Sequence, residues 1–544
     1  MMKHAISVKV AVLAEDRTRR SPECHIEYRV PFYRVALALS ASWLLVACGA
    51  GGTGPGSVVA VPPVRGTLLQ NPPVLLSTQT VAGLLAELSG STNQTLLALS
   101  GVPLCDIQIY QIRYATAGGA GEATTASGAL MVPSGLDSRC HGSRPLLLYA
   151  HGTTTDRTNN IADLSNTGNA EGLLLVAMFA AQGYIVIAPN YAGYDTSTLP
   201  YHPYLNADQQ SKDMIDALAA ARSALPLPLA PLTDDSGQLF ITGYSQGGFV
   251  AMATQRAMQA AGTKITASAP MSGPYALAAF VDAVYAGQVD AGAPILMTFL
   301  MTAYQRSFGD IYVSAADVFE LPYATGIDDL LPSTLPRSAL YSENKVPQFA
   351  LFSAVPPDPS FAAMTPATMP ANLAPLFAVG FGSGNLIKNS YRLSYLQDEQ
   401  ANPDGGWPIV TTGMPAANPT LWFRMELKRN DLRNWMPTVP TLLCGGDADP
   451  SVFWLNTELM QQYWTAQAVQ ASLISVLNLE AASPPGDLYV SERAQFAIAK
   501  QLVVAEALAQ GATDGGVRAL IEAYHATLVA PFCFTAVRSF FSNQ

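Results

Sequence analysis

The sequence is poor in charge. Only 13% of its 544 residues are Asp, Glu, Lys or Arg, whereas 49% are hydrophobic. A chain of this length and composition can bury a large interior, which excludes an intrinsically disordered protein. The formal net charge is −11, and the body of the chain has no basic stripe or run of Lys and Arg. Nucleic acid is therefore not expected as a partner.

Long hydrophobic runs are also scarce. The apolar run Val35–Val46 follows Arg34 and is too short to span a bilayer, as expected for the apolar region of a signal peptide. It leads into Leu45-Val46-Ala47-Cys48-Gly49, which resembles the lipobox of bacterial lipoproteins, where the cysteine is lipidated and becomes the first mature residue. The alternative is an ordinary signal peptide cut nearby, with Cys48 incidental.

Either interpretation predicts export to a bacterial cell envelope. We expect a signal peptide over residues 1–47, and a lipid anchor with a flexible Gly/Pro-rich tether over residues 48–74. The mature protein would be held on a membrane through Cys48, as an outer-membrane lipoprotein, or would be secreted. Removing residues 1–47 removes seven basic and four acidic residues, which leaves 22 Lys and Arg against 36 Asp and Glu, a net charge of −14.

Short apolar segments alternate with helical ones along most of the chain. A hairpin is expected from Ile107 to Val132, and helices are expected at Asp208–Leu225 and Glu492–Gln510. Buried strands are predicted at Pro145–Ala150, Gly183–Ala188, Leu239–Thr242, Ile265–Met271, Val439–Cys444 and Ser472–Leu477. Continuous apolar strands that alternate with helices indicate an α/β fold, with a mostly parallel sheet and helices on both faces.

This alternation stops between about Ala276 and Trp435. The segment contains Pro-rich turns, the apolar helix-like run Ala293–Tyr304, and scattered Phe and Met residues. We expect a large inserted cap (lid) domain over residues 276–435, with a small core of its own and an apolar surface turned toward substrate. The α/β core would then consist of residues 75–275 and 436–544.

Few cysteines remain once the leader is set aside. Cys24 would leave with the signal peptide and Cys48 would be lipidated. Four cysteines in an oxidising compartment suggest two disulfides, with three possible pairings, and their spacing fits no zinc site. We favour Cys105–Cys140 and Cys444–Cys533, because each pair would join neighbouring parts of the expected fold.

The chain is organised around Gly243-Tyr244-Ser245-Gln246-Gly247. The motif follows the apolar strand Leu239–Thr242 and precedes a helical segment that starts near Phe249. This is the nucleophile-elbow pattern, G-x-S-x-G between a strand and a helix. Ser245 must stand on a sharp turn, where a Cβ at Gly243 or Gly247 would collide. The alternative is a glycine-rich turn whose serine has no catalytic role.

A serine nucleophile needs a base and a carboxylate that orients it. His525 is the one histidine after the last predicted strand. Asp449 follows the strand that ends at Cys444, and it precedes His525 in the chain order of α/β-hydrolases. Asp447 is the rival acid, and we interpret it as a turn residue that bonds to local backbone.

The oxyanion of the reaction needs two N–H donors. One should be Gln246, which follows the nucleophile. The other should be Thr153, in the loop His151-Gly152-Thr153 after an earlier strand. His151 is better suited to loop packing than to a role as base. His202 is expected to be structural or to line the site, and His141 to be solvated.

With these residues the chain resembles α/β-hydrolases and, within them, the secretory lipase family related to Candida antarctica lipase A. The His-Gly-Thr-Thr loop, the elbow, the insertion before the acid-bearing strand and the late histidine carry this resemblance, over about residues 75–541. It implies the α/β-hydrolase fold and hydrolysis of hydrophobic carboxylic esters, acylglycerols or polyester fragments among them, through an acyl-enzyme. No metal or organic cofactor is implied, and the chain is assumed to be a monomer.

Two other functions stay open. An exported serine peptidase or amidase would use the same groups, but it would need a charged anchor for the peptide N-terminus; the candidates are Glu320, Asp328, Asp329 and Glu343. A non-catalytic binding lipoprotein on a hydrolase scaffold is the third possibility. The presence of serine, aspartate and histidine in this order argues against it.

Overall fold

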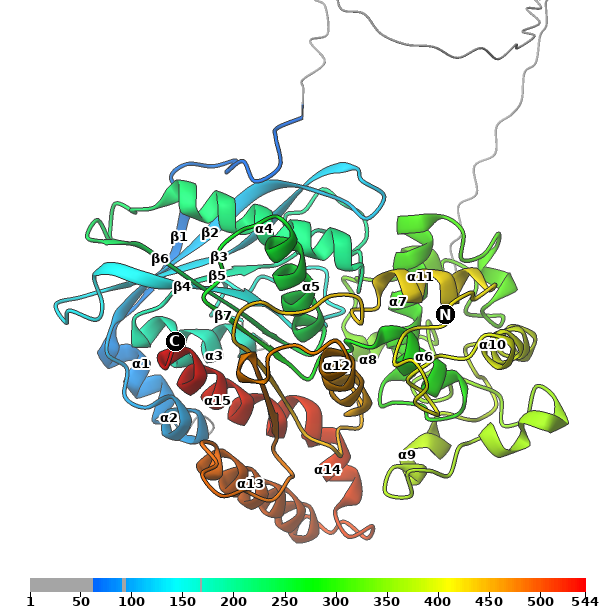
Figure 1. The fold of residues 1–544 in the computed structure, drawn as a ribbon. Helices are drawn as coiled ribbons and strands as arrows, with labels where there is room; N and C mark the ends of the chain where they lie inside the picture. Colours follow the sequence, from blue (N-terminus) through cyan, green and yellow to red (C-terminus); the bar gives the residue numbers. More distant parts are fainter. Residues whose placement is uncertain (1–61, 91–93, 167–168) are drawn as a thin grey trace, which may run out of the picture. The chain divides into compact units, whose positions relative to one another are not determined.

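The structure of the protein is a computed structural model, which describes residues 62–90, 94–166 and 169–544. The expected signal peptide, Cys24, Cys48 and most of the tether lie outside these residues. The described strands form one nine-stranded sheet in the order β1-β2-β3-β5-β4-β6-β7-β8-β9 (Figure 1). Pairing is antiparallel from β1 through β3 to β5, and parallel from β5 onward.

The strands have the following bounds: β1 Val74–Gln79, β2 Asp106–Ala117, β3 Ala123–Ser134, β4 Gly142–Ala150, β5 Ile185–Pro189, β6 Thr233–Tyr244, β7 Ala267–Met271, β8 Thr441–Gly445 and β9 Ile474–Asn478. The helices are α1 Val81–Leu88, α2 Gln94–Ser100, α3 Ala170–Met178, α4 Ala207–Ala224, α5 Gln246–Ala260, α6 Leu277–Tyr285, α7 Ala293–Phe308, α8 Arg337–Ser342, α9 Ala374–Val379, α10 Asn389–Ala401, α11 Trp422–Asn430, α12 Leu455–Ala466, α13 Val490–Ala509, α14 Val517–Ala523 and α15 Ala530–Ser542. Outside residues 276–435, β1, α2, α3 and α12 were not predicted from the sequence.

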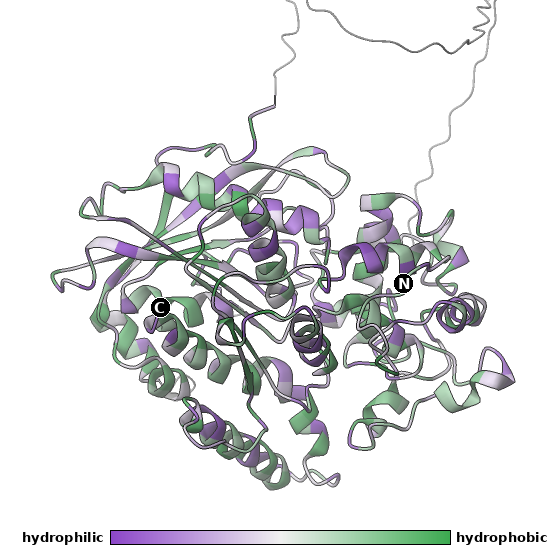
Figure 2. Cartoon of the chain, viewed as in Figure 1, coloured by the Kyte–Doolittle hydropathy of each residue, from purple (hydrophilic) through white to green (hydrophobic). Residues whose placement is uncertain are grey.

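Helices cover both faces of the sheet, as expected (Figure 1). Successive side chains of a strand point to opposite faces. On β4, Leu146 and Leu148 belong to one core with α4 and α5, whereas Leu147 and Tyr149 belong to a second core with α3 and α15. Figure 2 shows the strands of this central region largely in the colour of apolar residues. Burial on both faces explains why these strands read as continuous apolar runs.

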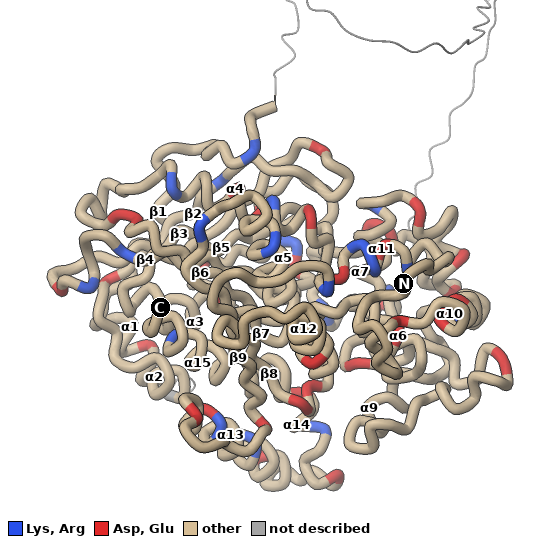
Figure 3. Tube along the Cα trace, viewed as in Figure 1, with Lys and Arg blue, Asp and Glu red and all other residues tan. Residues whose placement is uncertain are grey.

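Between β7 and β8 the described chain forms helices α6 to α11 without a further strand of the sheet. Buried ion pairs hold this segment together. Arg424 lies 2.8 Å from both Asp282 and Asp398, and Arg433 lies 2.7 Å from Asp404 and 2.9 Å from Asp431. Each guanidinium faces two carboxylates, so its charge is compensated although water is excluded. Figure 3 shows how sparse the charged residues are along the trace.

Two disulfides join the pairs that the sequence analysis favours, Cys105–Cys140 and Cys444–Cys533. The second bond ties β8 to α15. Helix α15 belongs to Val517–Ser542, the one helical run in the described residues that is long and apolar enough to cross a membrane. Half of its most apolar window is buried, and α15 packs its aromatic side chains into the second core beneath the sheet. Length and composition therefore do not distinguish it from a core helix.

Candidate active site

Ser245 stands on a strained turn between β6 and α5. Its backbone angles are φ 59° and ψ −121°, a conformation that costs a non-glycine residue about 1–3 kcal/mol. The turn is tight because β6 runs directly into α5. A Cβ on Gly243 would overlap the carbonyl oxygen of Gly247, and a Cβ on Gly247 would overlap that of Ala150. Both glycines are therefore needed for close approach of backbone to backbone.

The structure brings Asp449 and His525 together. Nδ1 of His525 lies 2.7 Å from Oδ2 of Asp449, although the two residues are 76 positions apart. Asp449 is buried, and its Oδ1 accepts the main-chain N–H groups of Ser451 at 2.9 Å and Val452 at 3.1 Å. A carboxylate accepts hydrogen bonds, so Nδ1 carries the hydrogen and Nε2 keeps its lone pair.

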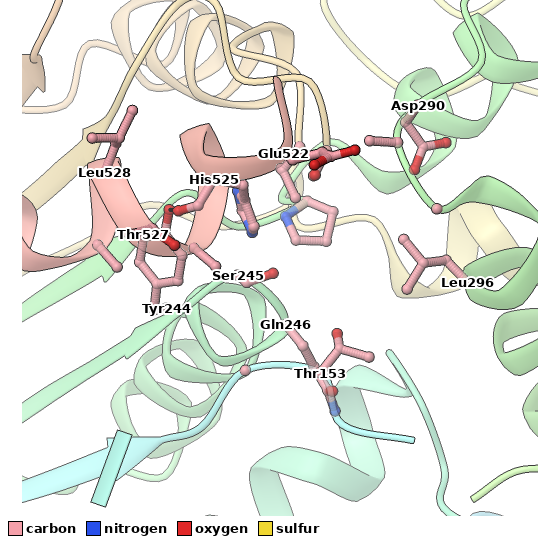
Figure 4. Close-up of a pocket in the computed structure, with 18 of the residues that line it drawn as sticks. Thr153, Tyr244, Ser245, Gln246, Asp290, Leu296, Glu522, His525, Thr527 and Leu528 are labelled. Carbon is pink, nitrogen blue, oxygen red and sulfur yellow. Dashed lines mark hydrogen bonds between the residues drawn. The ribbon is translucent and has the colours of Figure 1, made fainter. Parts of the chain in front are cut away.

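Nε2 of His525 is buried without a hydrogen-bond partner among the described residues. Figure 4 shows the imidazole beside Ser245, and both side chains line the same cavity. His525 belongs to a π-helical turn, Tyr524–Val529, inside one continuous helical run from α14 to α15. The π-turn is stabilised from β6, because the Tyr244 hydroxyl donates to the His525 carbonyl oxygen.

The rival acid Asp447 lies elsewhere. Its Oδ2 accepts a hydrogen bond from the side-chain amide of Asn478 at 3.0 Å, on the exposed side of the β8–β9 edge. No hydrogen bond or ion pair joins Asp447 to His525 in the described structure. Asp449, two residues later, is the carboxylate that the turn after β8 directs inward.

Two free N–H groups are available near Ser245. Gln246 is the first residue of α5, and Thr153 lies in the loop after β4; within the described chain neither main-chain N–H has an acceptor. Both residues line the cavity with Ser245 (Figure 4). The N-terminus of a helix also favours negative charge in front of it. The arrangement therefore suits an anion that develops at a carbon bonded to Ser245 Oγ.

A cavity of about 1010 Å³ opens at Ser245. Its walls are mostly apolar. On one side they consist of residues of α6 and α7, namely Leu277, Val281, Val284, Leu296, Met297 and Leu300; on the other side Ala499, Leu502, Val503 and Ile521 come from α13 and α14. An apolar enclosure of this size accommodates a hydrophobic ligand, and the few polar groups orient it.

Several known proteins are similar to this chain. Residues 174–286, which include the elbow, match the Prolyl oligopeptidase family. The rice cell wall degrading esterase LipA from Xanthomonas oryzae is 28% identical over 76% of this chain and 91% of its own, with a TM-score of 0.58. A putative hydrolase from Legionella pneumophila shares the fold, with 17% identity over 88% of this chain and 97% of its own and a TM-score of 0.57.

The sequence matches none of the curated proteins with which it was compared. Candida antarctica lipase A, at 11% identity over 76% of this chain and 77% of its own, has a TM-score of 0.46. The strand order, the strained elbow between β6 and α5 and the match to the LipA structure all indicate the same fold. The chain is an α/β-hydrolase similar to esterases. The predicted fold is thereby confirmed.

Two other histidines in the described part of this α/β-hydrolase, His151 and His202, are buried. His151 stacks on Tyr191 with ring centroids 4.2 Å apart and does not line the cavity. His202 is fully buried, and burial lowers its pKa to about 3, so the ring stays neutral. Its Nδ1 donates to the Ala192 carbonyl oxygen at 2.9 Å, and its Nε2 therefore accepts the side-chain amide of Gln246 at 2.7 Å. His202 thus fixes the orientation of the Gln246 side chain.

Three groups of the site were not found from the sequence. Glu171, on α3, accepts the Gly152 N–H at 3.0 Å and the Tyr149 hydroxyl at 2.7 Å, which fixes the loop that carries Thr153. Tyr204 shares a hydrogen bond of 3.0 Å with the Thr153 hydroxyl. Asp290 lines the cavity from the loop before α7. Of these three groups, only Glu171 has a local sequence signal, because Asn169 precedes it as the N-cap of α3.

The four carboxylates considered as a peptide anchor do not line the cavity. Asp328 accepts a short hydrogen bond of 2.5 Å from the Tyr312 hydroxyl, and Asp329 pairs with Arg306. Glu343 lies 3.9 Å from Lys345 on the surface. Glu320 is likewise outside the cavity wall, so none of the four faces Ser245.

Proposed function

We propose that this protein is a serine carboxylic-ester hydrolase that acts on hydrophobic esters through an acyl-enzyme. The observation that carries the proposal is the 2.7 Å contact between Asp449 and Nδ1 of His525, which leaves Nε2 unpartnered beside the strained Ser245. The neighbouring LipA structure is that of an esterase, which supports the same reaction type.

The proposed reaction has two half-steps. As Ser245 Oγ bonds to the ester carbonyl carbon, Nε2 of His525 takes the hydroxyl proton and Asp449 stabilises the imidazolium. The carbonyl oxygen becomes negative and is met by the N–H groups of Gln246 and Thr153. Collapse of this intermediate breaks the bond to the alcohol oxygen, which receives the proton from His525. Water then repeats the sequence on the acyl-enzyme, which releases the acid and restores Ser245.

The test is hydrolysis of p-nitrophenyl butyrate by the mature protein and by Ser245→Ala. We expect the variant to lose turnover and covalent labelling by a fluorophosphonate, with its melting temperature kept. Ser342→Ala, an exposed serine on α8, is the matched control and should behave as wild type. Turnover retained by Ser245→Ala would refute the assignment, and an unlabelled, inactive wild type would point to the binding lipoprotein.

The match to the Prolyl oligopeptidase family favours one second candidate, a serine peptidase or amidase. Ester and amide hydrolysis use the same groups, so the bond must be tested directly. We expect the butyrate ester to be turned over and matched aminoacyl p-nitroanilides not to be. Amide turnover without ester turnover would favour the peptidase.

We also propose that residues 276–435 form a cap that shapes the substrate cavity. Helices α6 and α7 of this segment supply much of the apolar wall, which supports the idea. Leu296→Trp on α7 should reduce turnover of long-chain p-nitrophenyl esters while p-nitrophenyl acetate is spared. Equal effects on both chain lengths would contradict a role of α7 in binding the substrate chain.

Lipidation of Cys48 and a place in the bacterial envelope are proposed on the lipobox-like sequence before it. In a bacterial host, the wild-type protein should incorporate a palmitate analogue and fractionate with membranes. Cys48→Ser should do neither. Membrane fractionation of Cys48→Ser equal to wild type would exclude lipidation as the means of attachment.

A further inference from the structure

Asp290 is a buried carboxyl that the reaction does not use. Only 8% of the residue is exposed, yet it lines the cavity that contains Ser245 and His525. Within the described chain, its carboxyl accepts no hydrogen bond from another residue. A buried polar group with so few partners is costly, and such a group in a binding cavity indicates a missing ligand atom.

The loop that carries Asp290 is hydrogen-bonded to the turn that carries Asp449. The N–H of the next residue, Ala291, donates to the carbonyl oxygen of Pro450 at 2.8 Å, which ties the loop before α7 to the turn that holds Asp449. Figure 4 shows Asp290 on the far wall of the cavity from Ser245. Between them lies the space in which a bound ester must extend.

The protonation state of Asp290 indicates which ligand group it can bind. Burial raises the pKa of Asp290 to about 8, so at neutral pH the group is a carboxylic acid, with one O–H donor and a free acceptor oxygen. A hydroxyl group also donates and accepts, and it matches both. An ammonium only donates and would require the acid to ionise. No ion pair joins Asp290 to Arg337, the cation of the cavity wall, in the described structure.

We propose that Asp290 is a specificity-determining residue that binds a free hydroxyl in the alcohol part of the substrate, so that esters of diols and polyols are preferred over simple alkyl esters. The alcohol part is favoured because its oxygen must reach Nε2 of His525, and Asp290 is tied to the turn that holds the partner of that histidine. The inference rests on the proposed ester hydrolase and adds the substrate class.

The experiment compares kcat/KM for 2-hydroxyethyl butyrate and propyl butyrate, which differ by a hydroxyl in place of a methyl group. We expect the wild type to prefer the hydroxyethyl ester by about tenfold, the range of one neutral hydrogen bond in a site built for it. Asp290→Asn keeps a donor and an acceptor and should retain the preference. Asp290→Leu should reduce it to within about twofold and still hydrolyse propyl butyrate.

A wild type without preference between the two esters would overturn the proposal, whether or not the variants fold. An equal preference in wild type and Asp290→Leu would do the same. A stronger preference for 2-(dimethylamino)ethyl butyrate that disappears in Asp290→Asn would show an amine site instead. Fluorophosphonate labelling and p-nitrophenyl butyrate turnover, measured on every variant, separate these outcomes from a failure of the proposed Ser245 chemistry.

Discussion

Replacing Asp449 by Asn should set the wrong tautomer of His525. In the wild type, Oδ1 of Asp449 accepts two main-chain N–H groups and Oδ2 accepts Nδ1–H of the imidazole. The asparagine oxygen must stay with the two N–H groups, because its NH₂ cannot accept them. The NH₂ then faces Nδ1 and donates to it. The hydrogen of the neutral ring consequently moves to Nε2, which can no longer take a proton from Ser245.

The size of this effect follows from the loss of the base rather than from a change of fold. A tautomer error in a Ser-His-Asp arrangement lowers kcat by about 10⁴-fold, or about 5 kcal/mol of transition-state stabilisation. The assay is kcat and KM for p-nitrophenyl butyrate at neutral pH, with circular dichroism to confirm folding. KM should change little, because Asp449 does not contact the substrate.

Asp447→Asn is the matched control for this prediction. Asp447 lies two residues away and bonds to Asn478 at the surface, so its amide should support wild-type kcat. If Asp449→Asn retained more than about a tenth of wild-type kcat, the reasoning from the two accepting oxygens would be refuted. If Asp447→Asn were the inactive variant, the acid would have been assigned to the wrong residue.

Three other predictions concern stability and support of the site. Cys444→Ser opens a covalent loop of 89 residues and should lower the free energy of unfolding by about 4–5 kcal/mol in the chain-entropy account; a loss below 1 kcal/mol in urea titrations would contradict it. His202→Phe removes the acceptor of the Gln246 amide and should lower kcat about tenfold at unchanged KM, whereas unchanged initial rates would exclude a positioning role. Burial raises the pKa of Asp213 to about 7, so the folded state holds a proton that the unfolded state releases above about pH 4. Unfolding free energy should therefore fall between pH 5 and 7 by about 1.4 kcal/mol per pH unit from this group, and Asp213→Asn should remove that slope.

Local sequence determined the central strands of the core and selected Ser245 as the candidate nucleophile. The strands β5, β7 and β8 are short apolar runs because both of their faces are buried, and the elbow is visible because backbone contact demands Gly243 and Gly247 on either side of Ser245. Chain order selected His525 and left Asp447 and Asp449 as candidate acids, of which Asp449 was preferred because Asp447 was interpreted as a turn residue. The two disulfide pairs followed from the expected neighbourhood of their strands and helices.

Other features depended on contacts between segments distant in the chain. Glu171 supports the Thr153 loop from a helix that the sequence analysis missed, because its role lies in a hydrogen bond across 19 residues rather than in a periodic pattern. The π-turn that carries His525 is held by Tyr244, 281 residues away.

Asp290 also could not be identified from the sequence alone. A single aspartate in a Gly- and Ala-rich loop gives no signal of its own, and the four carboxylates selected from the sequence as an anchor lie outside the cavity. Burial beside Ser245 distinguishes Asp290, and burial is a property of the packed chain. Periodicity and motif spacing report what a segment does locally, whereas the partners of a polar group are chosen only when distant segments pack together.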